Sequence, residues 1–454
     1  MSTPTPNIAI IGAGPVGLML AAILHHNGIK FKIFERETSA TVRAQGGTLD
    51  IHAETGQKAL AAAGLLPAFK KISRPEGEAT RVVKKDGTVL LDENEPQEQQ
   101  QTQDQKNGDG QEGEEEEGRG RPEIDRRDLK DLLIAALPED IVRWGKGISS
   151  VTPVPGTQRW KLEFVGSDTT ISSSRSSNNN AEDSESGPYD LVLGADGAWS
   201  RVRPLLTDVR PLYSGVTALD VWISAAQLAQ RPDVAAFIGR GSCMLLSADR
   251  FLSLQRHGDG SARAYAMVRT SREIGGEAAP DAKTLLGLEG EDDRDDAAAV
   301  DWTNAKTRER FLDRHFGDYV REARDAVLAM TEQPALRPLY MLPVGHRWEP
   351  RPGVTLLGDA AHVMTPFAGV GVNVGMMDAL ELAEGIAAYV KRHGEEQGEG
   401  GRGDLAEMLR EYENGMFERS RKDAALTARM LEVEFSEDGP EKVLEVMSGG
   451  GPSS

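Results

Sequence analysis

A glycine-rich turn near the start of the chain has the spacing of a dinucleotide-binding motif. Gly12, Gly14 and Gly17 follow a short apolar run and open a helix-like segment. Glycines at this spacing permit a tight turn and let the backbone approach a pyrophosphate, which then faces the unpaired N–H groups of the helix N-terminus. Glu35 closes the next strand-like run, about 20 residues further on, where an acid accepts hydrogen bonds from ribose hydroxyls. The pattern predicts a bound dinucleotide more strongly than a plain turn.

Two later segments also place acids and glycines directly after apolar runs. One extends from Gly194 to Arg203 and contains Asp196, and the other extends from Gly358 to Asn373. An acid at a strand end can bind a ribose or ribityl hydroxyl, and a glycine-rich turn entering a helix can direct N–H groups at a ring that becomes anionic. Each segment has a simpler interpretation, because the first could be only a strand-end turn and the acid of the second only a helix cap.

Hydrophobic periodicity and turn signals locate the elements that must carry these residues. Residues 7–11 are predicted as a strand, 16–27 as a helix and 29–35 as a second strand, which together form one βαβ unit. Residues 404–436 carry apolar side chains at helical spacing and predict one long helix along the body. The other predictions are helices at 126–137 and about 374–390, and strands at 189–194, 216–223, 262–269 and 354–357.

Composition excludes several classes of protein. The chain has 454 residues, of which 39% are hydrophobic, and 49 are glycine. This excludes collagen, a coiled coil and a membrane bundle. Cys243 is the single cysteine, so neither a disulfide framework nor a cysteine-based zinc module is present, and it is expected to be a small buried hydrophobe. The eight histidines show no metal-ligating spacing, and no metal is predicted.

The net charge of −20 is concentrated in low-complexity segments. Four stretches carry a combined net charge of −18, at residues 92–121, 167–187, 280–299 and 394–403. They lack apolar periodicity, so we expect solvated insertions. The charge argues against nucleic-acid binding. Residues 8–24 are too short and glycine-interrupted for a membrane anchor, and a cytoplasmic protein is expected.

In this order and spacing, the three glycine- and acid-bearing segments resemble the group A FAD-dependent aromatic monooxygenases, which have the p-hydroxybenzoate hydroxylase fold. Segments 43–52, 63–66, 124–130 and 358–379 further resemble the tetracycline-inactivating branch of that family. The resemblance covers most of 7–85, 122–205 and 336–390.

The resemblance implies an α/β fold. A doubly wound, glutathione-reductase-like FAD-binding domain would be assembled from residues 1–75, 122–205 and 336–393. A mainly β substrate domain would comprise residues 76–121 and 206–335, and a long C-terminal helix would bridge the two.

The resemblance also assigns residues to parts of FAD. Arg126 would contact the phosphate or ribityl region, and Asp359 the ribityl chain or pyrophosphate side. Arg43 would meet the incoming nicotinamide dinucleotide. Alternatively, Arg43, Arg126 and Arg203 could be surface arginines, and Asp50 a strand-end turn acid. The predicted cofactor-binding set is Gly12, Gly14, Gly17, Glu35, Arg36, Arg43, Asp50, Arg126, Asp196, Asp359, Pro366, Gly369, Gly371 and Asn373.

The implied activity is an FAD-dependent monooxygenase that uses NAD(P)H and O2 to hydroxylate an electron-rich aromatic or polyketide-like molecule of secondary metabolism. The chemistry would occur at the flavin C4a carbon, and no side chain is predicted as a catalytic nucleophile. An arginine can pair with the extra phosphate of NADPH, so Arg43 favours NADPH over NADH. A monomer with no nucleic-acid or membrane partner is expected. A Baeyer–Villiger or epoxidising oxygenase and a flavin-binding sensor remain as alternatives, whereas the tryptophan spacing disfavours a halogenase.

The substrate pocket is expected between the FAD-binding domain and residues 205–340. Strand alternation places Asp220 and Trp222 on one face, and Arg263 and Tyr265 on one face of another strand. Asp220 and Arg263 stand where tetracycline-inactivating enzymes place a Gln and a His, which argues against tetracycline as substrate. The alternative is that Asp220 and Arg263 only pair with each other across the sheet.

Overall fold

The computed structural model describes residues 5–41, 46–94, 120–166, 185–288, 300–329, 333–395 and 401–448. Most of the four low-complexity segments, and Arg43, lie outside these residues. None of the helices within the described ranges combines the length and the apolar character that crossing a membrane requires.

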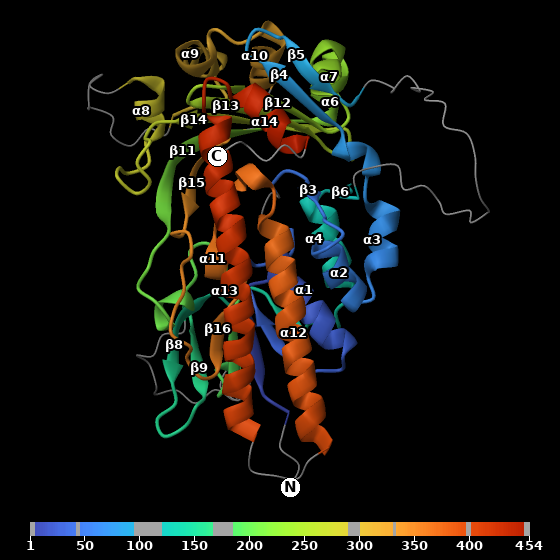
Figure 1. The fold of residues 1–454 in the computed structure, drawn as a ribbon, viewed down its shortest axis with the longest axis vertical. Helices are drawn as coiled ribbons and strands as arrows, with labels where there is room; N and C mark the ends of the chain where they lie inside the picture. Colours follow the sequence, from blue (N-terminus) through green and yellow to red (C-terminus); the bar gives the residue numbers. More distant parts are fainter. Residues whose placement is uncertain are drawn as a thin grey trace, which may run out of the picture.

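A five-stranded parallel sheet forms the base of the molecule (Figure 1). Its strand order is β16-β10-β1-β2-β7. Apolar runs buried on both faces build its centre, as expected for parallel strands covered by helices. The strands are β16 (Val354–Leu356), β10 (Leu191–Gly194), β1 (Ile8–Ile11), β2 (Lys32–Phe34) and β7 (Val142–Arg143).

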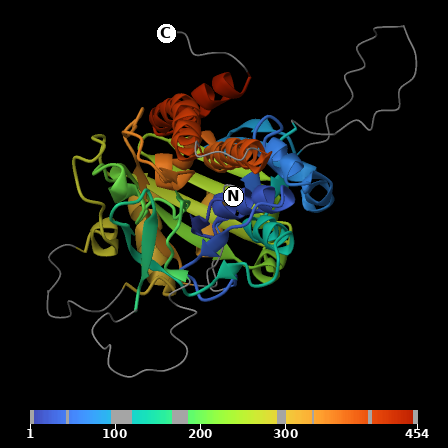
Figure 2. The ribbon, with the colours of Figure 1, turned by 90° about the horizontal axis from the view of Figure 1, so that it is seen from below.

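Helices from distant parts of the chain pack around this sheet. Helix α1 contacts α12, α4 and α2, and α12 lies beside the long helix α13 (Figure 1). Seen from below, α12 and α13 lie on one side of the molecule and are viewed nearly end-on (Figure 2). These helices are α1 (Pro15–His26), α2 (Gly56–Ala62), α3 (Leu66–Ile72), α4 (Arg126–Ala135), α11 (Asp359–His362), α12 (Gly371–Glu395) and α13 (Gly401–Glu434). Helix α14 (Gly439–Met447) packs instead against a second sheet.

A seven-stranded sheet lies above the parallel sheet, in the order β15-β11-β14-β13-β12-β4-β5 (Figure 1). Its neighbours are antiparallel except for β12 and β4, which are parallel. The strands are β15 (Ala335–Met341), β11 (Leu212–Ile223), β14 (Ala262–Arg269), β13 (Arg250–Arg256), β12 (Ser242–Ser247), β4 (Thr80–Lys84) and β5 (Val89–Asp92).

The two faces of this sheet differ in character. Leu219, Val221, Ala264 and Ala266 point to one face and join a buried apolar core with the helices that cover it. The opposite face carries Asp220 and its polar neighbours. The covering helices are α6 (Ala225–Gln230), α7 (Pro232–Ile238), α8 (Ala282–Leu286), α9 (Ala305–Phe316) and α10 (Arg321–Leu328).

Short elements complete the fold. They are the strand pairs β3 (Leu49–Asp50) with β6 (Glu123–Ile124) and β8 (Ile148–Pro153) with β9 (Trp160–Phe164), and the 3-10 turns η1 (Pro75–Glu78), η2 (Arg203–Leu205) and η4 (Pro366–Ala368).

The predicted α/β fold with a long C-terminal helix is confirmed. Helix α13 is continuous from Gly401 to Glu434, although the chain then turns into α14, which the sequence analysis did not anticipate. The domain boundaries predicted from the sequence stay a proposal. The pairing of β4 with β12 supports it, because this pairing places part of the segment 76–121 in the same sheet as residues 206–335.

A buried acid near the end of α13 leads to a prediction about stability. Glu434 is 2% exposed, and its Oε2 has no hydrogen-bond partner among the described residues. Burial raises the pKa of Glu434 well above its ordinary value. The unfolded chain ionises this group more readily than the folded chain, so its cost to stability grows as the pH rises above the ordinary value.

We therefore expect Glu434→Gln to stabilise the protein by about 1–3 kcal/mol at pH 8, and less at pH 5. Thermal unfolding of the two proteins at both pH values measures this. The exposed Glu411 on the same helix provides the control Glu411→Gln, for which no pH-dependent gain is expected. A gain that is larger at pH 5 than at pH 8 would contradict the assignment.

Candidate functional site

Three turns meet at one edge of the parallel sheet. The first follows β1, the second follows β10 and the third follows β16. Strands β1, β10 and β16 are adjacent and parallel, so the segments that follow them lie together at the carboxyl edge. The backbone confirms this, since Ala195 N–H donates to Ile11 O at 2.8 Å and Leu357 N–H donates to Gly194 O at 3.0 Å. In open α/β sheets this edge is where ligands bind, at the point where the strand order changes direction.

The glycines of these turns serve two purposes. A Cβ on Gly12 would lie 2.4 Å from Ala195 O, and one on Gly17 would lie 2.2 Å from Gly12 O, so close packing of the protein itself excludes a side chain there. By contrast, nothing lies within 4 Å of a Cβ built on Gly14, Gly197 or Gly371. The first pair shapes the turn, and the other three leave open space beside it. This space fits a dinucleotide laid across the turns.

Glu35 lies against the first turn. Its Oε2 accepts a hydrogen bond from Ala13 N–H at 2.7 Å and its Oε1 accepts one from Glu37 N–H at 3.0 Å. The carboxylate retains further lone pairs for ribose hydroxyls, so its predicted role stays open as a proposal. Arg36 is directed outward, with a side chain that is 68% exposed.

The second turn contains an acid with an unused oxygen. Asp196 Oδ2 accepts a hydrogen bond from Arg201 N–H at 2.6 Å, whereas Oδ1 is buried and has no partner in the described part of the chain. Burial raises the pKa of Asp196, although the Ser200 hydroxyl and Arg201 N–H act in the opposite direction. A hydroxyl group of a bound ligand could donate a hydrogen bond to this buried oxygen and so satisfy it.

Arg203 links the second turn to the third. Its Nε donates to Ala360 O at 2.8 Å, its Nη2 to Asp359 O at 3.0 Å and its Nη1 to Ala198 O at 2.8 Å. The side chain is buried. The alternative that Arg203 is a surface arginine is therefore wrong, because its buried guanidinium donates hydrogen bonds to backbone carbonyl oxygens of two turns.

A buried ionic group lies behind the third turn. Asp378 accepts hydrogen bonds from Gly358 N–H at 2.9 Å and from Arg419 Nη2 at 2.8 Å, and its Oδ2 lies 2.6 Å from His362 Nε2. Burial lowers the pKa of His362, but the contact with Asp378 outweighs burial and raises it overall. Asp359 itself is exposed at the start of α11, free to face a ligand. Sequence analysis missed Arg419, which lies on α13.

The N-terminus of α12 holds the segment that contains Asp50. Asn373 Nδ2 donates to Asp50 O at 2.8 Å, and His52 N–H donates to Asn373 Oδ1 at 2.8 Å. Asn373 is 1% exposed. The Asn373 amide thus holds the segment from Asp50 to His52 in place. The predicted contact of Asn373 with the flavin ring stays a prediction. Gly369 adopts φ +67° and directs its open side toward the Asp50 carboxylate, 3.8 Å from a Cβ built there.

Arg126 connects the cofactor side to the seven-stranded sheet. Its Nε donates to Gly47 O at 3.0 Å, and Gly47 N–H donates to the Tyr265 hydroxyl at 2.8 Å. Burial lowers the pKa of Arg126, against the influence of Tyr265 and Asp359 nearby. Gly47 therefore links Arg126, which is predicted to contact FAD, to Tyr265, which is predicted to contact the substrate.

The predicted substrate residues share one face of that sheet. Asp220 pairs in register with Tyr265, and Trp222 with Arg263. Arg263 Nε and Nη2 contact Asp220 Oδ1 and Oδ2 at 2.6 and 3.1 Å, so the two residues do pair across the sheet. The Arg263 guanidinium also lies 5.4 Å from the centre of the Trp222 ring. Sequence analysis missed Arg337, whose Nε also contacts Asp220.

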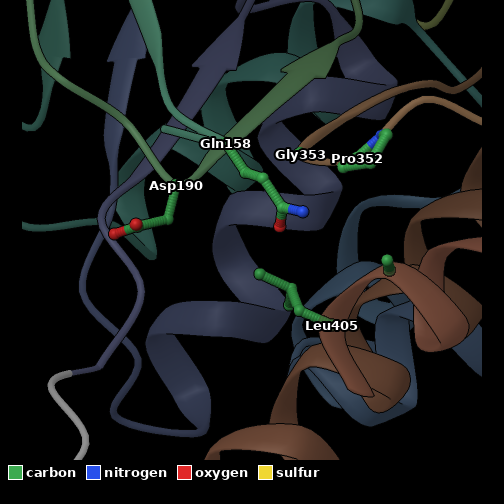
Figure 3. A pocket seen from close by; sticks show the side chains of 6 residues that line it. Gln158, Asp190, Pro352, Gly353 and Leu405 are labelled. Carbon is green, nitrogen blue, oxygen red and sulfur yellow. The ribbon is translucent and has the colours of Figure 1, made fainter. Parts of the chain in front are cut away.

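A separate small pocket lies away from these turns (Figure 3). Its volume is about 20 Å³, which is room for about one water molecule. It is too small for a cofactor or a substrate. Gln158, Asp190, Pro352, Gly353, Leu405 and Ala406 line it.

These features fit a dinucleotide cofactor laid across three turns beneath a second sheet. Residues 5–112 and 344–398 match the family model described as "FAD binding domain". The chain is 30% identical to the monooxygenase asqM of Emericella nidulans over 469 residues, which cover 97% of this chain and 98% of that protein. The chain belongs to the FAD-dependent monooxygenases.

Solved structures share the fold at low identity. The Klebsiella pneumoniae protein HpxO, complexed with FAD and uric acid, aligns over 98% of this chain and 92% of its own, with a TM-score of 0.65 and 18% identity. The tetracycline destructase Tet(55) aligns over 99% of this chain and 96% of its own, with a TM-score of 0.64 and 16% identity. The predicted family and FAD as cofactor are confirmed, while the roles of single residues stay proposals.

Gly14 allows a direct test of where the cofactor lies. Its φ of −73° is open to alanine, and the protein leaves space for the added methyl group. We expect Gly14→Ala to fold normally but to bind FAD at least about tenfold more weakly, because the methyl group occupies ligand space. Fluorescence titration of the apoprotein with FAD measures this. Gly415→Ala, within α13, is the control and should leave FAD binding unchanged. Unaltered affinity in Gly14→Ala would place the cofactor elsewhere.

The two acids of the first and third turns yield a second test. We expect Glu35→Ala and Asp359→Ala each to raise the Kd for FAD by about ten- to a hundredfold, if each removes a charged hydrogen bond of about 1.5–3 kcal/mol. Equilibrium dialysis against FAD measures the change. The exposed Glu407 provides the control Glu407→Ala. If the wild-type protein and all three variants bound FAD equally well, neither Glu35 nor Asp359 would belong to the FAD site.

Proposed function

We propose that the chain uses NAD(P)H and O2 to hydroxylate an electron-rich aromatic or polyketide-like small molecule of secondary metabolism. The observation that carries this proposal is the polar sheet face that Tyr265 and Gly47 join to Arg126, whose guanidinium lies within electrostatic reach of Asp359 on the third turn. Two fungal monooxygenases of nearly the same length are 30% identical to the chain, which supports the activity class.

The residues of the chain have binding and orienting roles in this proposal. When bound, FAD supplies the redox and oxygen-transfer chemistry. Gly12, Gly14 and Gly17 would admit its pyrophosphate, and the N-terminus of α12 would favour negative charge on the flavin ring. Trp222 and Tyr265 would hold the ring of the substrate against the sheet. Stacked above the FAD-binding turns, that sheet would also exclude water from the reacting atoms.

The hydroxyl of Tyr265 is suited to orient a substrate oxygen. Burial raises the pKa of Tyr265, so the phenol stays protonated at neutral pH. Because the oxygen accepts the hydrogen bond from Gly47 N–H, the hydroxyl proton remains available to a ligand acceptor. The preference for NADPH rests on Arg43, and it stays a prediction together with the monomeric state and the cytoplasmic location.

The reaction is tested with labelled oxygen. Holoenzyme is mixed with NADPH or NADH under ¹⁸O₂ and a panel of phenols, polyketides and alkaloids, and products are analysed by mass spectrometry and NMR. We expect one oxygen atom in the product and the other in water, with NAD(P)H oxidised once per turnover. A hydroxylated ring supports the proposal. A ring-expanded ester or an epoxide would replace hydroxylation with the alternative oxygenase reactions, and no flavin reduction by either nucleotide would contradict the proposal.

A further inference from the structure

Two acidic side chains lie next to each other on the short strands β3 and β6, which lie between the two large sheets along the long axis of the molecule (Figure 1). Glu123 on β6 pairs in register with Asp50 on β3. On its other side, Glu123 exchanges both backbone hydrogen bonds with Arg74, at 2.7 and 3.3 Å. Directly opposed residues of adjacent strands direct their side chains to the same face. Arg74, Glu123 and Asp50 therefore form a row with a carboxyl group in the middle.

The arginine of this row also serves other acceptors. Arg74 Nη2 lies 3.4 Å from Asp125 Oδ1 and donates to Arg256 O at 3.3 Å. Glu123 Oε2, by contrast, is buried and has no hydrogen-bond partner within the described ranges. A buried carboxyl oxygen without a donor is more stable when the group carries a proton.

The surroundings of Glu123 make its protonation sensitive to nearby charge. Burial raises the pKa of Glu123 to about 7. The negative charges of Asp50 and Asp125 also raise this pKa, whereas the Thr48 hydroxyl and Arg74 act against them. At neutral pH the carboxyl group is therefore close to half protonated, so a new charge nearby shifts its proton occupancy.

Further charged groups approach the row from neighbouring elements. Arg126, at the start of α4, lies within electrostatic reach of Glu123 and opposes the effect of the acids. The two nearby histidines are each paired with an acid other than Glu123. These pairs are His52 Nε2 with Asp50 Oδ2 at 2.7 Å and His257 Nδ1 with Asp125 Oδ1 at 3.1 Å. Glu123 can therefore gain a proton at Oε2 without breaking a hydrogen bond there.

Asp50 connects the row to the proposed position of the flavin ring. Its carboxylate lies 3.8 Å from a Cβ built on Gly369, and its carbonyl oxygen accepts a hydrogen bond from Asn373, near the start of α12. The flavin ring is proposed to lie at this helix N-terminus, where negative charge is favoured. Side chains of paired strand residues are about 5 Å apart, so Glu123 lies one such step behind Asp50. Partly buried charges at these separations interact strongly.

We propose that Glu123 takes up a proton when the flavin is reduced and releases it when the flavin is reoxidised. A hydride from NAD(P)H brings two electrons and one proton, which leaves the flavin ring with one negative charge. The Glu123 carboxylate then accepts one proton from solvent and becomes neutral, so that the two negative charges do not accumulate. Glu123 acts through its charge as a positioning residue. The proposal rests on the proposed position of the flavin ring, and not on hydroxylation.

The pH dependence of the flavin midpoint potential tests the proposal. Wild-type holoenzyme and Glu123→Gln are reduced with dithionite in the presence of reference dyes, between pH 5 and pH 9. At low pH, Glu123 is neutral in both redox states, as glutamine is. Above pH 7 the wild-type carboxylate disfavours reduction, so the potential of Glu123→Gln should rise relative to that of the wild type. We expect at least about a tenfold change in the reduction equilibrium, which is ~30 mV for a two-electron couple.

Infrared difference spectroscopy follows the proton itself. In spectra of reduced minus oxidised wild-type holoenzyme at pH 8, we expect the C=O band of a protonated carboxyl group, with a shift in D2O. This band should be absent in Glu123→Gln.

A milder variant and a matched control complete the design. Thr48→Val removes the hydroxyl that lowers the pKa of Glu123, so proton uptake should move to higher pH. Glu76→Gln makes the same chemical change as Glu123→Gln at an exposed acid of η1, and should leave the pH dependence of the potential unaltered.

Parallel pH dependence of the potential in the wild type and Glu123→Gln, or the same carboxyl band in both, overturns the proposal. If Glu123→Gln does not fold, Thr48→Val decides, and an unchanged pH range of proton uptake in Thr48→Val overturns the proposal. Because dithionite replaces the nicotinamide and no substrate is added, failure of NAD(P)H oxidation or of hydroxylation would count against the proposed function alone.

Discussion

The guanidinium of Arg203 is the interaction on which the cofactor side of the molecule depends. Parallel strand pairing brings the three turns to one edge, but it does not fix their separation. Arg203 does so, because its hydrogen bonds end on carbonyl oxygens of both the second and the third turn. Leaving a buried carbonyl oxygen without its donor typically costs about 1–3 kcal/mol. Asp378 performs the same task one layer deeper, where it ties the third turn to α12 and α13.

A second link joins this edge to the sheet above it. Gly47 uses both of its backbone groups, one toward Arg126 and the other toward Tyr265. The space is tight, since a Cβ on Gly47 would lie 2.1 Å from Gln255 Oε1. Gly47 therefore connects α4, which begins at Arg126, to β14, which carries Tyr265, through one peptide unit and two long side chains. Through this link the helices that pack on the parallel sheet are tied to the seven-stranded sheet.

Local signals made much of this site predictable. The glycine spacing, Glu35 and the strand-end acids Asp196 and Asp359 all act within a few residues of a strand, so sequence alone indicated them. Arg337 and Arg419 had no such signal, because each meets its partner only after folding. Arg337 lies 117 positions from Asp220, and Arg419 lies 41 from Asp378. The hydrogen bond from the Asn373 amide to Asp50 O could not be predicted either, because the two residues are 323 positions apart in the sequence. The short helices α6, α7 and α8 were missed because so few residues give weak periodicity, whereas α9, with 12 residues, was missed despite its length.

Helix α13 is a long, continuous helix that contacts both sheets. Its 34 residues extend about 50 Å at 1.5 Å per residue. Tyr412, about a third of the way along, donates to Leu356 O in the parallel sheet, and Leu431, near the C-terminal end, joins the apolar cluster beneath the seven-stranded sheet. Between them, Thr427 donates to Thr365 O at 2.6 Å, beside the turn that precedes α12. A hinge motion that separates the two sheets would have to bend α13 or break its contacts with one of them. Exchange of a ligand between the two sheets would therefore depend on movement of loops, because α13 holds the sheets at a fixed spacing.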